Sequence, residues 1–195
     1  MTAQLSLFGQ APSLPRGFKY QADLVSPAEE RELLEQLAGL PFREFEFHGH
    51  VGKRRVISFG WQYDFNKEQV CRVEDIPAFL LPVRQKAASF AGLEPDQLPH
   101  VLLTEYATGA AIGWHKDKRV FGDVVGISLL SSCIFRLRLK KGATWERASV
   151  VVEPRSAYLL RGPARTEWEH SIPAVESLRY SITFRTLKSG AVQRG

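Results

Sequence analysis

The sequence predicts an α+β fold that is mainly β, with a double-stranded β-helix (jelly-roll) core buttressed by N-terminal helices. Two amphipathic helical patterns occupy the first half of the chain, and many short apolar segments of strand length follow from residue 101 onward. A series of strands after helices favours this layered arrangement, because the apolar face of each element must pack against another element. The 195 residues, 44% hydrophobic and 24% charged, suffice for one well-packed domain.

Two helices are predicted from their caps and apolar stripes. The segment Ser26-Pro27-Ala28-Glu29 is a capping box with proline at the first helical position, and the helix that it starts ends at Gly39. A second apolar stripe runs over residues 77–90 and ends at Gly92. We expect both helices to pack against one sheet of the core.

Strands are predicted where apolar side chains alternate with polar ones or form short runs. Aromatic residues stand at every second position of 56–65, which predicts one continuous strand with a strongly aromatic face. These aromatic residues are Phe59, Trp61, Tyr63 and Phe65. Further strands are predicted at 101–106, 124–130, 134–139, 148–152, 157–160 and 180–186.

The charge, the apolar runs, the N-terminal residues and the cysteines indicate which classes of partner and which cell compartment to expect. The net charge of +5 and the isoelectric point of about 9.4 mildly favour a polyanionic partner. No apolar run approaches the roughly 18 residues of a membrane helix, and the N-terminus lacks the basic start and apolar core of a secretory signal. Cys71 and Cys133 lie far apart, so we expect reduced thiols in a cytoplasmic, monomeric protein.

Three residues with metal-ligand chemistry form the centre of the predicted site. His115 and Asp117 are two positions apart, so on an extended segment both side chains point to the same side. The third ligand, His170, must come from a distant strand that folds back beside them. Two imidazoles and one carboxylate with open positions form the facial triad of non-haem Fe(II) oxygenases.

Two arginines downstream extend this prediction to a co-substrate. Arg179 follows His170 by nine positions and Arg185 follows after six more, so in an extended segment the two arginines share a face. A planar, permanently charged guanidinium suits a carboxylate. A metal triad with paired arginines indicates Fe(II) with a dicarboxylate co-substrate.

These ordered motifs resemble the AlkB family of Fe(II)/2-oxoglutarate dioxygenases, which oxidatively dealkylate nucleic acids. The shared signature lies within residues 59–185 and comprises Glu105-Tyr106-x-x-Gly109, His115-x-Asp117, His170 and Arg179-Tyr-x-x-Thr-Phe-Arg185. A lone His-x-Asp occurs often by chance, whereas the ordered set is specific. The resemblance implies oxidative demethylation of N-alkylated bases in DNA or RNA, with release of formaldehyde, succinate and carbon dioxide.

The resemblance also implies a role for each matching residue. The metal-binding and catalytic residues would be His115, Asp117 and His170. Molecular oxygen would take the last open position of the iron. The residues implied for 2-oxoglutarate are Arg179 and Tyr106 at the far carboxylate and Arg185 at the near one, together with Thr104 and Ser181, each two positions from Tyr106 or Arg179 in the motif.

The chain departs from the best-known repair enzymes of this family at three positions. Thr104 and Ser181 each stand where an asparagine is common, so hydroxyls replace two amides at the co-substrate. Two residues past Asp117, Arg119 stands where an acidic residue faces the base in the bacterial enzyme. The metal triad is untouched, and the identity of the base is left open.

A basic and aromatic segment is the predicted nucleotide-recognition lid, which in the resembling family covers the active site. Basic residues that adjoin aromatic ones suit phosphate contact and base stacking. The structural alternatives are a solvated basic face and ordinary core packing of the aromatic side chains. The predicted substrate contacts are Arg54, Arg55, Trp61, Tyr63 and Arg119.

The chain is predicted to divide into a tail, residues 1–17, and a single catalytic domain, residues 18–195. Within the domain, 18–75 includes the lid and 100–186 the catalytic jelly roll. In the tail, Gln4-Leu5-Ser6-Leu7-Phe8 resembles the peptide by which bacterial DNA repair and replication proteins dock on the sliding clamp. Leu7 and Phe8 would enter an apolar pocket; alternatively, Leu5, Leu7 and Phe8 pack on the domain as a first strand.

Two other functions stay open at the level of the sequence. The first is a hydroxylase or demethylase on the same scaffold that acts on a tRNA or on a protein side chain, because fold does not fix substrate. The second is a non-catalytic nucleic-acid-binding module with a relict metal site. The intact set of three ligands argues against the second alternative.

Overall fold

A computed structural model of the chain describes residues 14–47, 50–64 and 69–190. The helices are α1 (Pro27–Ala38), α2 (Leu81–Ala91) and the short α3 (Gly162–Thr166), with two 3-10 turns, η1 (Ala78–Leu80) and η2 (Pro95–Gln97). The first strands are β1 (Phe18–Gln21), β2 (Arg43–Phe47), β3 (His50–Phe59), β4 (Trp61–Asp64), β5 (Gln69–Arg72), β6 (His100–Tyr106) and β7 (Ile112–His115). The remaining strands are β8 (Phe121–Leu129), β9 (Cys133–Lys141), β10 (Thr144–Val152), β11 (Ala157–Leu160), β12 (Glu169–Ile172) and β13 (Arg179–Leu187).

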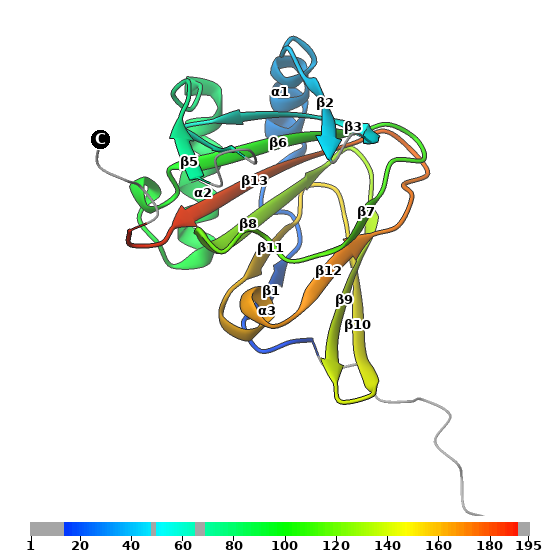
Figure 1. The fold of residues 1–195 in the computed structure, drawn as a ribbon. Helices are drawn as coiled ribbons and strands as arrows, with labels where there is room; N and C mark the ends of the chain where they lie inside the picture. The colour runs from blue at the N-terminus through cyan, green and yellow to red at the C-terminus, as the bar shows by residue number, and fades with distance from the viewer. Residues whose placement is uncertain (1–13, 48–49, 65–68, 191–195) are drawn as a thin grey trace, which may run out of the picture.

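The strands form two facing sheets and one separate hairpin. The large sheet has seven strands in the order β1-β11-β8-β13-β6-β3-β2, and the small sheet has four in the order β10-β9-β12-β7. Strands β4 and β5 make the hairpin. Figure 1 shows the small sheet beside the large one, with the ends of β9 and β10 extending from the body of the molecule. The predicted mainly β jelly-roll architecture is confirmed.

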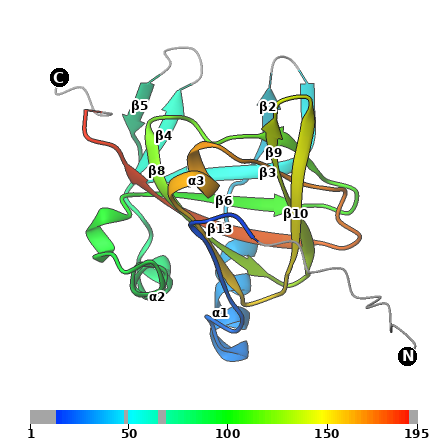
Figure 2. The ribbon, with the colours of Figure 1, turned by 90° about the horizontal axis from the view of Figure 1, so that it is seen from below.

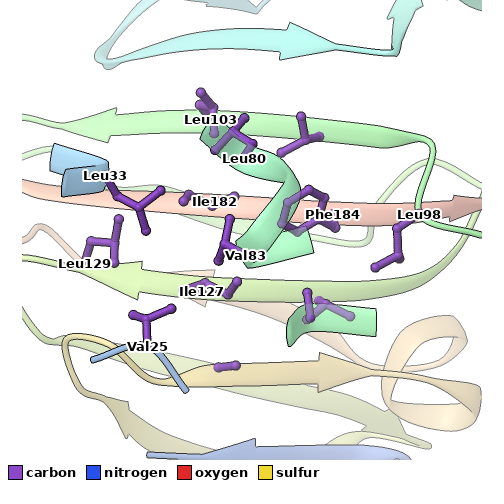
Figure 3. Close-up of a cluster of buried hydrophobic side chains, with 14 of the residues drawn as sticks. Val25, Leu33, Leu80, Val83, Leu98, Leu103, Ile127, Leu129, Ile182 and Phe184 are labelled. Atoms are coloured by element: carbon purple, nitrogen blue, oxygen red, sulfur yellow. The ribbon is translucent and has the colours of Figure 1, made fainter. Parts of the chain in front are cut away.

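Helices α1 and α2 cover the outer face of the large sheet, as Figure 2 shows. Strand residues alternate in direction, so every second side chain of β13 and its neighbours faces the helices. Figure 3 shows Leu80 and Val83 against Leu103, Ile182 and Phe184 from β6 and β13. The predicted buttressing of one sheet by the N-terminal helices is confirmed.

Helix α1 begins at its predicted cap and both main helices end at the predicted glycines, whereas α2 begins at Leu81, after the 3-10 turn η1, and not at the predicted residue 77. The Ser26 hydroxyl accepts a hydrogen bond from the Glu29 amide at 3.2 Å, and the Ser26 amide donates to the Glu29 carboxylate at 2.7 Å. This reciprocal pair satisfies two amides that have no partner within the helix. Gly39 follows α1, and Gly92 ends α2 in the left-handed conformation with φ of 65°.

The prediction of one continuous strand over 56–65 is wrong, because the strand is interrupted at Gly60. Gly60 has φ of +75°, and a Cβ at this position would lie 2.0 Å from the carbonyl oxygen of Pro99. Strand β3 therefore ends at Phe59, which is buried among the core residues, and β4 begins at Trp61 in a different sheet. Trp61 and Tyr63 are half-buried on the hairpin, and Phe65 lies outside the described residues.

The first described residues are attached to the domain. The carbonyls of Arg16 and Gly17 accept hydrogen bonds from the amides of Ala164 and Arg161, and β1 then pairs with β11. The predicted clamp-binding peptide, with Gln4, Leu5, Leu7 and Phe8, lies outside the described residues. Within the described ranges, no helix has the length and apolar character needed to cross a membrane.

We predict that Gly60→Ala destabilises the protein more than Gly142→Ala does. Both glycines have positive φ, 75° and 58°, but an added Cβ at Gly142 meets no heavy atom within 4 Å. Gly142→Ala should cost about 1–2 kcal/mol for the left-handed backbone alone. Gly60→Ala adds the clash with the Pro99 backbone, so it should lower the free energy of unfolding, measured in urea, by clearly more. Equal losses for the two variants would contradict this account of the break in the strand.

Candidate active site

The inner face of the large sheet, opposite the helices, carries a row of polar side chains. In the pairing of β6 with β13, Tyr106 lies opposite Arg179, Thr104 opposite Ser181, and His100 opposite Arg185. Directly paired residues share a face of the sheet, so all six side chains point away from the helix side. All six are at most 8% exposed. The predicted co-substrate residues are therefore gathered on one buried face: Tyr106, Thr104, Arg179, Ser181 and Arg185.

The two predicted histidine ligands lie opposite each other in the small sheet. His115 on β7 pairs directly with His170 on β12, and the centroids of the two rings are 4.2 Å apart. The Nδ1 atom of His115 lies 2.9 Å from the carbonyl oxygen of Gly113, which can only accept. A proton on Nδ1 leaves the lone pair on Nε2 for a metal, which is the usual way in which a ligand imidazole is oriented.

The third predicted ligand, Asp117, is held from the large sheet. Its Oδ1 atom accepts a hydrogen bond from Nη2 of Arg185 at 3.0 Å. Burial alone raises the pKa of Asp117, but the charge of Arg185, supported by that of Arg165, outweighs burial and holds that pKa well below its ordinary value. Burial, followed by the neighbouring His115, lowers the pKa of His170 to about 3. Both groups are therefore in the deprotonated form that a metal requires.

The donor set at this place fits a divalent iron. Two neutral imidazoles and one carboxylate come from His115, His170 and Asp117, which is the combination that non-haem Fe(II) sites use. In the described part of the chain, no three side chains of His, Cys, Asp or Glu already stand in metal-binding geometry. The Asp117 carboxylate is paired with Arg185 at 3.0 Å.

The Arg179 guanidinium has the chemistry of a carboxylate-binding group. It is fully buried, its Nε donates to the Ser128 hydroxyl at 2.9 Å, and its Cζ lies 4.8 Å from the centre of the Tyr106 ring. Its Nη1 atom is buried with no hydrogen-bond partner, and among the described residues no acidic side chain forms an ion pair with it. A buried cation without a counter-charge is costly, so this arrangement fits an anionic ligand.

Arg185 makes a different contact from the one that the sequence predicts. The prediction places it at the near carboxylate of 2-oxoglutarate, whereas its Nη2 binds Asp117 and its guanidinium lies 5.2 Å from the ring of Phe121. Its Nε is buried without a hydrogen-bond partner. Arg185 therefore positions a predicted metal ligand, with one nitrogen left for a further acceptor.

Adjacent arginines of the predicted lid lie on opposite faces of the large sheet. Arg54 pairs with Tyr106 in the register of β3 and β6, which directs it to the inner face, and burial lowers its pKa. Arg55 pairs with Glu105 instead and forms two hydrogen bonds of 2.8 Å with that carboxylate. Tyr180 also donates to Glu105 at 2.8 Å. Arg54 is thus directed to the inner face and Arg55 to the Glu105 carboxylate on the other face, and substrate contact by either arginine stays a prediction.

The β4–β5 hairpin lies beside the loop that follows the Asp117 ligand. The Nζ atom of Lys118 is 5.1 Å from the centre of the Tyr63 ring. Trp61 on the same hairpin contacts the Arg72 guanidinium, with 5.8 Å between charge and ring centre. Arg119 is exposed on the loop. These three predicted substrate residues, Trp61, Tyr63 and Arg119, therefore lie in one neighbourhood at the edge of the site.

Three residues of the site escaped the sequence-based prediction. Ser128 binds Arg179, and its signal is a lone hydroxyl inside the apolar segment 124–130. Arg165 on α3 donates to the carbonyls of Lys118, Phe121 and Gly122 at 2.7 to 2.9 Å, and it therefore shapes the loop after Asp117. His100 lies beside Arg185 by register. For Arg165 and His100 the sequence has no spacing or motif that indicates such a place.

Comparison with known proteins now identifies the family. A model of the 2OG-Fe(II) oxygenase superfamily matches residues 17–185, which is most of the chain. The chain belongs to this superfamily. The matched range includes both sheets and every residue of the candidate site described above. The family implies Fe(II), 2-oxoglutarate and O2 as the groups used.

Similar proteins support the AlkB-like resemblance. The chain is 29% identical to an Arabidopsis thaliana protein named alkylated DNA repair protein ALKBH8 homolog, over 87% of this chain and 54% of that protein. It is 26% identical to the Xenopus tropicalis tRNA (carboxymethyluridine(34)-5-O)-methyltransferase alkbh8, over 83% of this chain and 26% of that protein. The chain thus spans about half or less of these two relatives. In fold, OsALKBH1 aligns with a TM-score of 0.71 at 15% identity, over 89% of this chain and 98% of that chain.

We predict that two of the candidate ligands, Asp117 and His115, differ in their effect on stability when each is replaced by alanine. Asp117→Ala removes a ligand and also leaves the Arg185 charge buried without its partner, which should cost about 3–5 kcal/mol. His115→Ala leaves no unpaired charge and should cost clearly less. Both substitutions should abolish the binding of Co(II), which is measured by the visible absorption of the bound ion. Retained Co(II) binding in either variant, with a folded protein by circular dichroism, would contradict the assignment.

Proposed function

We propose that this AlkB-like oxygenase oxidatively demethylates N-alkylated bases in DNA or RNA, with formaldehyde, succinate and carbon dioxide as products. The observation that carries the proposal is the Arg179 guanidinium, fully buried and lacking an acidic partner among the described residues, on the sheet that faces the His115 and His170 pair. A carboxylate co-substrate supplies the missing charge there. Nucleic acid as the substrate class rests on the names of the relatives and on the basic composition of the chain.

In the proposed reaction, His115, His170 and Asp117 would hold the iron, and Arg185 would keep the carboxylate of Asp117 in place. The chemistry supplied when iron, 2-oxoglutarate and O2 are bound is hydroxylation of the methyl carbon attached to the base nitrogen. The bond from nitrogen to the hydroxymethyl carbon would then break, with the hydroxyl proton lost and a proton gained by the base nitrogen, which releases formaldehyde and the unmodified base. The chain contributes the geometry and a site from which bulk water is largely excluded.

Arg179 orients the co-substrate in this proposal. Its Nε is fixed by Ser128, and its face is covered by Tyr106, so the free Nη1 presents a donor in one direction. A charge-assisted hydrogen bond in a buried place is short and strong, and little side-chain entropy is lost because the guanidinium is already held. The hydroxyls of Thr104 and Ser181, paired across β6 and β13, line the same face.

The substrate base would enter from the side of the β4–β5 hairpin. Trp61 and Tyr63 offer aromatic faces for stacking, and Arg54 offers a charge for a phosphate or a base edge. A base reaches a site between two sheets only when it is taken out of its stack, which costs least in single strands or at weakened pairs. We therefore propose single-stranded or mispaired nucleic acid as the preferred form.

A second candidate is a modified base of tRNA. It is favoured by the similarity to two proteins of Xenopus tropicalis and Mus musculus that are named tRNA methyltransferases, at 26% and 25% identity. Because the chain covers at most 26% of those proteins, their named methyl-transfer reaction is not part of the proposal. An exposed arginine at position 119, close to the proposed entrance, suits either a DNA or a tRNA phosphate.

We predict that methylated DNA or RNA oligonucleotides yield formaldehyde and succinate with this chain in the presence of Fe(II) and 2-oxoglutarate, as measured by mass spectrometry. Arg179→Ala should raise the required 2-oxoglutarate concentration by about thirty-fold or more, since a charge-assisted pair is worth on the order of 2–5 kcal/mol. Ser128→Ala, which removes only the support of Arg179, should raise it less. An unchanged 2-oxoglutarate requirement in Arg179→Ala would overturn the co-substrate assignment. If succinate forms at the same rate with and without the methylated oligonucleotide, and no formaldehyde appears, the proposed substrate class is overturned.

The neighbouring arginines of β3 offer a matched test of the substrate side. Arg54→Ala should raise KM for a methylated oligonucleotide several-fold, because Arg54 lies on the inner face. Arg55→Ala should leave KM unchanged and lower stability by about 1 kcal/mol, because it removes a half-exposed ion pair with Glu105. Steady-state kinetics and urea unfolding separate the two effects. A larger KM effect in Arg55→Ala than in Arg54→Ala would contradict the proposed orientation of the lid.

A further inference from the structure

The outer face of the small sheet is strongly basic. The inward residues of this sheet include His115, His170 and the buried Phe135 and Leu137, so the alternate positions point away from the site. The register confirms that Arg138 lies opposite Glu169 on one side and Arg147 on the other. The outer basic face is defined by Trp114, Arg136, Arg138, Lys140, Trp145, Arg147, Glu169 and Ser171.

The charges of this outer basic face do not balance. Its four cations, Arg136, Arg138, Lys140 and Arg147, stand against one carboxylate, Glu169. Lys140 and Arg147 are exposed, and in the part of the chain that is described neither has an ion-pair partner. Arg138 and Arg147 lie directly opposite each other on neighbouring strands, an arrangement of like charges that destabilises a sheet. Within the described residues, Lys140 and Arg147 thus contribute no ion pair to the folded state, whereas an anionic partner would pair with both.

Two tryptophans hold the central arginine of the face in one orientation. The Arg138 guanidinium lies 4.4 Å from the ring centre of Trp114 and 4.2 Å from that of Trp145, and its Nε binds Glu169 at 2.6 Å. Arg136 lies 5.3 Å from Trp114, and its Nε donates to the Ser171 hydroxyl at 3.2 Å. Both guanidinium groups are therefore preorganised, which reduces the entropy lost when they bind a ligand.

The face leads toward the candidate active site. Strand β7 is the edge of the small sheet, and its Trp114 on the outer face immediately precedes the candidate ligand His115 on the inner face. The chain continues from there to the exposed Lys116 and Arg119 on either side of Asp117. Positive charge thus lies on β9 and β10 and again in the residues that follow β7, with β12 between them; Figure 1 shows these four strands side by side.

We propose that the outer basic face binds the sugar–phosphate backbone of the nucleic-acid strand whose base enters the site. The proposal rests on the proposed function for the class of partner. Arg136, Arg138 and Lys140 occupy alternate positions of β9, so their Cα atoms follow one another at about 6.8 Å along a line. A linear row of cations matches an extended polyanion, and backbone contacts fix the position of a strand without reading its sequence.

The test compares two double variants that each remove two exposed cations. Lys140→Ser/Arg147→Ser removes two positive charges from the outer basic face. Lys19→Ser/Arg31→Ser removes equal charge from β1 and α1, away from that face. The probe is an unmodified, fluorescein-labelled single strand of about 16 nucleotides, and fluorescence anisotropy measures its Kd between about 50 and 200 mM salt. The salt slope of log Kd should fall by about 1.4 in the first variant, which corresponds to about 25-fold weaker binding at 0.1 M salt, and hardly change in the second.

Three outcomes would overturn the proposal. The first is equal weakening in both double variants, which would mean that net charge alone attracts the strand. The second is no measurable binding of the strand by the unaltered chain at low salt. The third is displacement of the strand by polyglutamate at equal charge concentration as effectively as by unlabelled nucleic acid, which would indicate an acidic protein as the partner.

The experiment also separates this inference from the proposed function. It uses an unmodified strand and requires no turnover, so a chain that fails to demethylate oligonucleotides can still confirm or refute the binding face. Conversely, formation of formaldehyde from a methylated mononucleotide, together with unaltered strand binding in Lys140→Ser/Arg147→Ser, would leave the proposed chemistry intact and refute the face alone.

Discussion

The arrangement of the candidate site depends on the ion pair between Asp117 and Arg185. Asp117 follows the edge strand of the small sheet, and Arg185 belongs to a central strand of the large sheet, so their 3.0 Å contact joins the two halves of the jelly roll. Both side chains are about one-tenth exposed, at 11% and 10%. Separating two such charges leaves each in a poorly solvated place, which resists any movement of the sheets apart. Arg165 reinforces the same place by donating to the carbonyl of Lys118 in the loop after Asp117 and to those of Phe121 and Gly122 at the start of β8.

Strand β13 shows how one segment serves both the core and the site. Its residues Tyr180, Ile182 and Phe184 pack under α1 and α2, whereas Arg179 and Arg185 point between the sheets. A side-chain period of two makes this division unavoidable, because any shift of register by one residue would bury the arginines under the helices. The same rule separates Arg54 from Arg55 on β3 and His115 from Trp114 on β7. Stability and chemistry are thus placed on opposite faces of the same strands.

Much of the fold and of the candidate site follows from local patterns in the sequence. The capping box at Ser26, the glycines after both helices and the alternation of apolar residues depend on neighbours a few positions away, so they can be read from the chain directly. The Arg179 to Arg185 spacing is the same kind of signal, since both residues lie on β13, and the His115-x-Asp117 spacing joins the last residue of β7 to the residue two positions after it. The resemblance to AlkB-like oxygenases combines these short segments in their order, and the family comparison confirms it.

Contacts between distant segments could not be predicted in this way. The alternation of Phe59, Trp61 and Tyr63 is typical of a single strand, but the backbone of Pro99 approaches Gly60 and divides that strand between two sheets. Arg185 has the residue type of a co-substrate ligand, and only its place opposite β7 pairs it with Asp117. Ser128, Arg165 and the outer basic face likewise arise from strands and helices that are far apart in the chain. Local periodicity determines which way a side chain points from its own strand, whereas the packing of the sheets determines what it meets.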